Sequence, residues 1–93
     1  MQTPEDVLAA CRGYKLGDSE TFHAVIASTL VVLGLLQVEL AAYLKVTPPT
    51  ISRWMSGKHA PQARIQASVL KDVARRITYT LQHRERRQQK QIS

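Results

Sequence analysis

The sequence has few of the residues on which enzymes, metal sites and secreted domains depend. It contains one cysteine, Cys11, so no disulfide can form within the chain, which fits a reducing cytoplasm. The three histidines show no spacing typical of metal ligands, and no glycine-rich phosphate loop occurs. Nothing marks a base beside Cys11, so we expect a small buried apolar residue there and not a nucleophile. The sequence therefore predicts no enzyme, no cofactor and no metal site.

Long apolar runs are scarce as well. The most apolar segment, residues 24–36, is shorter than the roughly 20 residues that a membrane-spanning helix needs. Acidic residues precede any apolar run at the N-terminus, so we expect no signal peptide. Ninety-three residues suffice for one small domain. We expect a single cytoplasmic domain over residues 1–82, with no membrane partner, and a basic polar tail over residues 83–93 that is either mobile or a solvated helix end.

Acidic residues are rare in the second half of the chain. Residues 1–44 hold two basic and five acidic residues, a net charge of −3. Residues 45–93 hold eleven basic and two acidic residues, a net charge of +9, which brings the whole chain to +6. This division indicates one face for a polyanion, although a solvated basic surface has the same composition.

Two short helical patterns occupy residues 37–57, on either side of a break. The break falls at Val46-Thr47, because a proline disfavours the helical conformation for the residue before it. Proline is tolerated in a first helical turn, so the second helix is expected to begin at Pro48, to be capped by Thr47 and to end at Gly57. The apolar residues at helical spacing are Val38, Leu40, Ala41, Leu44, Ile51, Trp54 and Met55. Two such helices at a steep angle describe a helix-turn-helix.

The same residues carry a family resemblance. Residues 37–58 resemble the Cro/C1-type helix-turn-helix family, the lambda-repressor-like or XRE domains, in the pattern Gln37-x-Glu39-Leu40-Ala41-x-x-Leu44-x-Val46-Thr47-x-x-Thr50-Ile51-Ser52-Arg53-Trp54-x-x-Gly57-Lys58. The sequence departs from the family at Leu36, where a Ser or Thr cap is usual, and at Lys45, where the family favours a left-handed glycine. It departs again at Pro48-Pro49, where relatives often place base-reading residues.

Helices are also predicted before the motif. Thr3-Pro4-Glu5-Asp6 is typical of a helix start, so a short extra helix is expected from Pro4 to about Arg12. Asp18 or Ser19 should cap a second helix that runs to about Leu33, ends at Gly34 and is apolar around more than half its circumference. His23 is expected at the edge of its apolar face as a packing or capping residue.

After the motif, an apolar stripe predicts a long C-terminal helix that starts near Pro61. The stripe consists of Ile65, Val69, Leu70, Val73, Ala74, Ile77 and Leu81. Whether this helix is continuous or breaks near Ser68 is left open by the pattern. The predicted fold class is all-α: a small helical bundle with a lambda-repressor-like helix-turn-helix, an extra N-terminal helix and a long C-terminal helix.

The second motif helix is the predicted DNA-recognition element. A helix-turn-helix places this helix in the major groove, where the planar fork of Arg53 can bind guanine O6 and N7 together. Thr47 either binds phosphate or only caps the helix, and His59 either binds phosphate or is a solvated loop residue. The candidate base-reading residues are Arg53, Pro48, Pro49, Thr50 and Ser52, and the candidate phosphate-binding residues are Gln37, Thr47, Ser56, Lys58 and His59.

The expected function is sequence-specific binding of double-stranded DNA by a bacterial or phage-encoded, nucleoid-associated regulator. We expect a repressor or autorepressor of phage or mobile-element type that occludes a promoter. One motif covers half an operator, so a homodimer on a palindromic operator is expected. Its interface is predicted at Ile77, Tyr79 and Leu81 or on the apolar helix 18–33; otherwise the end of the long helix packs on its own domain. The alternative function is an antitoxin-like adaptor that binds a partner protein as well as operator DNA.

Overall fold

The computed structural model describes the backbone of residues 1–92 and the side-chain surroundings of residues 1–84. The chain forms five helices: α1 (Pro4–Arg12), α2 (Ser19–Leu33), α3 (Gln37–Leu44), α4 (Pro48–Ser56) and α5 (Ala63–Ile92). No strand occurs among the described residues, which confirms the all-α prediction. The tail predicted over residues 83–93 continues α5 as far as Ile92, and the surroundings of its side chains from residue 85 onward lie outside the described residues.

The helix starts follow from local capping chemistry. The Asp6 N–H donates to Thr3 Oγ1 at 3.1 Å, and the Thr3 N–H donates back to the Asp6 carboxylate at 3.2 Å, which confirms the predicted start of α1. At α2 the Asp18 carboxylate accepts from the Thr21 hydroxyl at 2.6 Å and from its N–H at 3.2 Å. These two bonds stabilise the charged carboxylate and lower the pKa of Asp18 below its ordinary value.

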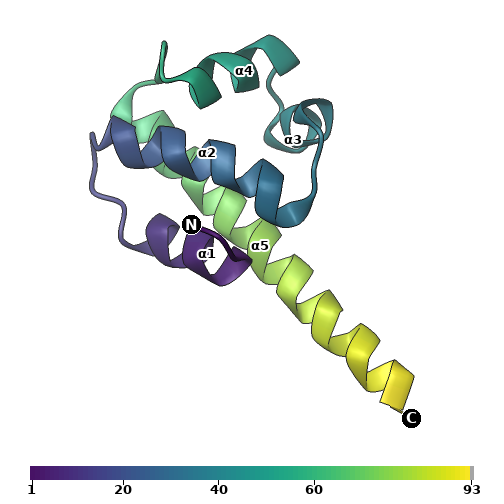
Figure 1. Ribbon diagram of the computed structural model, residues 1–93. Coiled ribbons are helices and arrows are strands. Elements are labelled where there is room, and N and C mark those ends of the chain that lie inside the picture. The colour runs from purple at the N-terminus through teal and green to yellow at the C-terminus, as the bar shows by residue number, and fades with distance from the viewer. Residues whose placement is uncertain (93) are drawn as a thin grey trace.

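Helix α2 is the central element of the bundle. Figure 1 shows α4 and α1 on opposite sides of it, while α5 crosses behind it and continues beyond the other helices. Because α2 is covered on several sides, it can be apolar around most of its circumference. The core buries side chains from all five helices: Val7, Phe22, Val25, Ile26, Leu30, Leu40, Ala41, Ile51, Trp54, Val69, Leu70, Val73 and Ile77.

Two residues assigned to apolar stripes in the sequence are exposed. Val38 is 55% exposed because it lies about 200° around α3 from Leu40, at 100° per residue. Ile65 is 48% exposed in the first turn of α5. The buried position in that turn belongs to Gln66, whose side chain accepts from the Tyr14 hydroxyl at 2.7 Å and donates to Ser19 Oγ at 3.0 Å. The buried Gln66 side chain is satisfied by these hydrogen bonds. The spacing of apolar residues in the sequence does not reveal such a buried polar position.

Helix α5 is one continuous rod from Ala63, so the break considered near Ser68 does not occur. Ile77 is completely buried in the chain's own core, which corrects its assignment to a dimer interface. Tyr79 is 53% exposed and Leu81 is half-buried, so these two side chains still present surface.

No single helix among the described residues is long and apolar enough to cross a membrane. Helices α2 and α3 meet that requirement only when taken together, and the chain bends by 117° between them.

We expect Ala41→Leu to lower the free energy of unfolding by about 1–3 kcal/mol, because Ala41 is 1% exposed and a larger side chain there would overpack the core beside α4. The matched control is Ala42→Leu on the exposed neighbouring position of the same helix. Urea unfolding followed by circular dichroism measures both. Equal destabilisation by the two variants would show that Ala41 has no special place in the packing.

Candidate nucleic-acid interface

The turn between α3 and α4 sets the two helices at a steep angle. In Figure 1, α3 is seen almost along its axis while α4 runs across the picture. Lys45 ends α3 in the left-handed conformation, with φ 60° and ψ 42°. The Val46 N–H then donates to the Ala41 carbonyl at 2.9 Å, which closes the last turn of α3 and directs the chain into α4.

Helix α4 divides cleanly into an inner and an outer face. Ile51 is fully buried and Trp54 is 6% exposed. The outer face is open to solvent and carries Pro48, Pro49, Ser52, Arg53 and Ser56, whereas Thr50 is half-buried at its edge. The predicted base-reading residues are therefore brought together on one face, with Thr50 the least accessible of them.

Trp54 fixes α4 against α2. Its ring meets the Phe22 ring edge-on, with centroids 5.2 Å apart. Its backbone carbonyl, at the end of α4, lies 2.6 Å from His23 Nδ1. A carbonyl oxygen only accepts, so Nδ1 carries the proton and His23 caps the C-terminus of α4. This confirms the packing or capping role predicted for His23, although the sequence did not show which helix it caps.

The hydroxyls near the two ends of α4 are engaged locally. Thr47 is the N-cap residue of α4, as predicted, but its side chain makes no bond to a backbone N–H. Its hydroxyl pairs instead with the Thr50 hydroxyl at 2.9 Å. The Ser56 hydroxyl donates to the Arg53 carbonyl at 3.0 Å. Both Thr47 and Ser56 remain exposed, so each hydroxyl can still accept a bond from outside the chain or donate one after rotating.

The start of α3 offers a second set of outward groups. Gln37 is exposed at the first position of the helix. Leu36 provides no side-chain cap, and instead the Glu39 carboxylate accepts from the Leu36 N–H at 2.9 Å. The remaining predicted phosphate ligands, Lys58 and His59, are exposed in the loop after α4.

The charge on α4 and on the loop that follows it has one sign. No acidic residue occurs in the sequence between Glu39 and Asp72, a stretch that contains the whole of α4. Arg53 is exposed and unpaired, since the ion pair found among the described side chains joins Arg75 to Asp72. An exposed, unpaired arginine on a helix without acidic residues is suited to an anionic partner.

The structure offers no competing chemistry among the residues it describes. They contain no group of three or more His, Cys, Asp and Glu side chains that could hold a metal ion. Burial raises the pKa of the Cys11 thiol to about 11, so at neutral pH it is a thiol and not a nucleophilic thiolate.

Comparison with protein families matches residues 33–82 to the family described as Helix-turn-helix. The match covers more than half of the chain and includes α3, α4 and the first two thirds of α5. No curated protein and no solved structure matches the chain.

We expect Lys45→Gly to raise the free energy of unfolding by about 0.5–1 kcal/mol. Glycine removes the steric cost of the left-handed conformation in the folded protein. This gain in free energy exceeds the loss that arises because glycine makes the unfolded chain more flexible. Lys45→Ala is the control, because it removes the same charge but keeps a Cβ. Thermal or urea unfolding compares the two variants, and equal stability of the glycine and alanine proteins would exclude backbone strain at this position.

Proposed function

Because the chain belongs to the Cro/C1-type helix-turn-helix family of DNA-binding transcription regulators, we propose that it recognises one operator sequence and represses transcription by occluding a promoter. The observation that carries the proposal is the open outer face of α4, on which Arg53 stands unpaired while the inner face is held by Ile51 and Trp54. A rigidly seated helix with a free outer face is what major-groove recognition requires.

Arg53 is the proposed base-reading residue. Its guanidinium can donate two hydrogen bonds to O6 and N7 of one guanine, an interaction worth about 1–3 kcal/mol of discrimination against other bases. Pro48 and Pro49 have no N–H to donate, so they contribute by packing against a thymine methyl or a sugar. Ser52 and Thr50 supply hydroxyls, of which the Thr50 hydroxyl is shared with Thr47.

Phosphate contacts would surround this base-reading face. Gln37 presents its amide beside the N-terminal N–H groups of α3, where the helix dipole favours an anion. Lys58 and His59, after α4, and the hydroxyls of Thr47 and Ser56, near its ends, complete the proposed set. These contacts position the helix and contribute affinity that depends on salt.

We expect Arg53→Ala to weaken binding to the operator by about 10- to 100-fold and binding to an unrelated duplex much less, because only the base contact is sequence-specific. The operator is first obtained by selecting duplexes from a random library and by testing the DNA upstream of the protein's own gene. Fluorescence anisotropy at about 50 and 200 mM salt then gives the affinities.

The control variant is Arg12→Ala on α1, which lies on the opposite side of α2 from α4 (Figure 1). It should leave both affinities unchanged. No sequence preference at either salt concentration would contradict the proposal and leave only a general attraction of basic groups for DNA. A strong preference that survives Arg53→Ala would move base reading to other residues.

A homodimer on a palindromic operator forms part of the proposed function. The regulator would be of phage or mobile-element type, would control its own operon, and would act in the cytoplasm on the DNA of the nucleoid. One α4 reads one half-site, and the few base contacts available on it give modest affinity. Two copies whose recognition helices lie about one turn of DNA apart would bind both half-sites together.

For the dimer, we expect Val31→Glu to favour the monomer and Tyr79→Ala to leave dimerisation unchanged. Val31 is 81% exposed near the end of the apolar helix α2, whereas Tyr79 lies among like-charged arginines that would repel a second copy. Sedimentation equilibrium over a range of concentrations measures the association. Ala9→Glu, at an exposed position of α1, is the control for an added charge. Dissociation by Tyr79→Ala alone would place the interface on α5.

A further inference from the structure

Helix α5 carries a basic and aromatic face that DNA recognition does not use. The last fully buried residue of α5 among those described is Ile77, yet the helix continues to Ile92. Figure 1 shows this extension running away from α4. Leu81 still packs against the core, but Tyr79, His83 and Arg84 of this segment are exposed. These three side chains are free to contact another partner.

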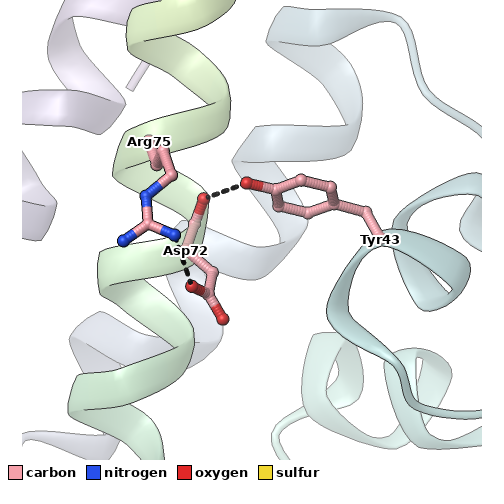
Figure 2. Close-up of polar contacts among 3 residues, drawn as sticks. All are labelled: Tyr43, Asp72 and Arg75. Carbon is pink, nitrogen blue, oxygen red and sulfur yellow. Dashed lines mark hydrogen bonds and ion pairs between the residues drawn. The ribbon is translucent and has the colours of Figure 1, made fainter.

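The face begins where α5 passes the end of α3. The Tyr43 hydroxyl of α3 donates to the Asp72 carbonyl of α5 at 2.9 Å, which fixes the tyrosine ring against the long helix (Figure 2). The Arg76 guanidinium carbon then lies 5.8 Å from the centroid of the Tyr43 ring and 5.8 Å from that of the Tyr79 ring. One turn further on, the His83 ring lies 4.1 Å from the Tyr79 ring. The four side chains therefore lie next to one another along this face of the molecule.

Two shallow grooves lie along this stack. One, of about 240 Å³, is lined by Tyr43, Arg75, Arg76 and Tyr79. The other, of about 380 Å³, is lined by Arg76, Tyr79, Thr80, His83 and Arg84. They share Arg76 and Tyr79, so together they form one surface, the α5 groove, along successive turns of the helix.

The α5 groove carries an excess of positive charge. Its lining contains three arginines, Arg75, Arg76 and Arg84, and no acidic residue. Asp72 pairs with Arg75 at 3.9 Å (Figure 2), and among the described side chains no acidic residue pairs with Arg76 or Arg84. The sequence that follows adds Arg86, Arg87 and Lys90 against Glu85 alone. A second copy of the chain would oppose like charges on this face, whereas an acidic partner would neutralise them.

We propose that the α5 groove binds an acidic, amphipathic segment of a partner protein. The tyrosine rings would receive an apolar or aromatic side chain of that segment, and its carboxylates would pair with Arg75, Arg76 and Arg84. Tyrosine and arginine are the residues most enriched at the energetic centres of protein interfaces, and arginine binds carboxylates through two parallel hydrogen bonds. Duplex DNA would satisfy the charge, but its bases are paired and stacked inside the helix, so it offers no apolar side chain to the tyrosine-lined groove. This proposal does not depend on the identity of the operator.

The test selects binding peptides from a displayed random library against the full chain, in the presence of excess nonspecific duplex DNA to occupy α4. We expect the enriched peptides to combine Asp or Glu with an apolar side chain. Tyr79→Ser and Arg84→Gln should each weaken their binding by about tenfold, as truncation of a central interface residue does. Both residues are exposed, so neither change disturbs the core.

Arg64→Gln is the matched control, because Arg64 is exposed on α5 but lies outside the groove. It should leave peptide binding unchanged, and Tyr79→Ser and Arg84→Gln should keep the wild-type affinity for DNA. Enriched peptides without acidic residues, or peptides that bind all variants equally, would overturn the proposal. If the selection enriches no acidic peptides, and Tyr79→Ser and Arg84→Gln lose DNA binding, the groove would instead be identified as a nucleic-acid surface. Because DNA affinity is measured on the same samples, failure of this proposal is separate from failure of the operator proposal.

Discussion

The burial of Trp54 is the constraint on which the rest of the structure depends. The ring is held edge-on by Phe22 of α2, and the carbonyl of the same residue accepts from His23 one position further along. One residue of α4 is thus tied to two adjacent residues of α2 by packing and by a hydrogen bond at once. Because this bond also caps the C-terminus of α4, the helix is fixed in position and in rotation about its axis. The outer face of α4 can be entirely polar or exposed because its attachment to the domain uses only the inner face.

The two prolines at the start of α4 have a cost and a benefit for recognition. They remove backbone donors from the end of the helix that enters the groove in this family, so few polar groups remain to read bases. They also restrict the unfolded chain, which stabilises the first helical turn by lowering the entropy lost on folding. Since α4 has a single charged residue, Arg53, the proposed recognition would depend on surrounding phosphate contacts and on a second half-site for its affinity.

Local chemistry made most of the fold predictable from the sequence, and tertiary contacts account for what was missed. The capping threonine of α1, Asp18 before α2, and the glycines after α2 and α4 act on their own neighbours, so their effect can be read without knowing the fold. Thr47 has the sequence of a cap, but its hydroxyl bonds to Thr50 instead. Gln66 was missed because its partners Tyr14 and Ser19 are distant in the sequence. Arg53 was placed correctly on an exposed face, since that depends on helical period alone, whereas its contact with a base remains a prediction.

The first half of α5 and the part that follows it have different surroundings, and Tyr43 lies beside α5 between the two. The first half of α5 packs against α1 and α2, while Arg75 and, further along, Arg84 are exposed to solvent. Tyr43 belongs to α3, the first helix of the motif, but its hydroxyl bonds to α5 and its ring is covered by Arg76. A partner seated in the α5 groove would therefore touch the motif directly. If that partner binds more tightly to one placement of α3 than to another, it changes the affinity of α4 for DNA, and DNA changes the affinity for the partner by the same factor.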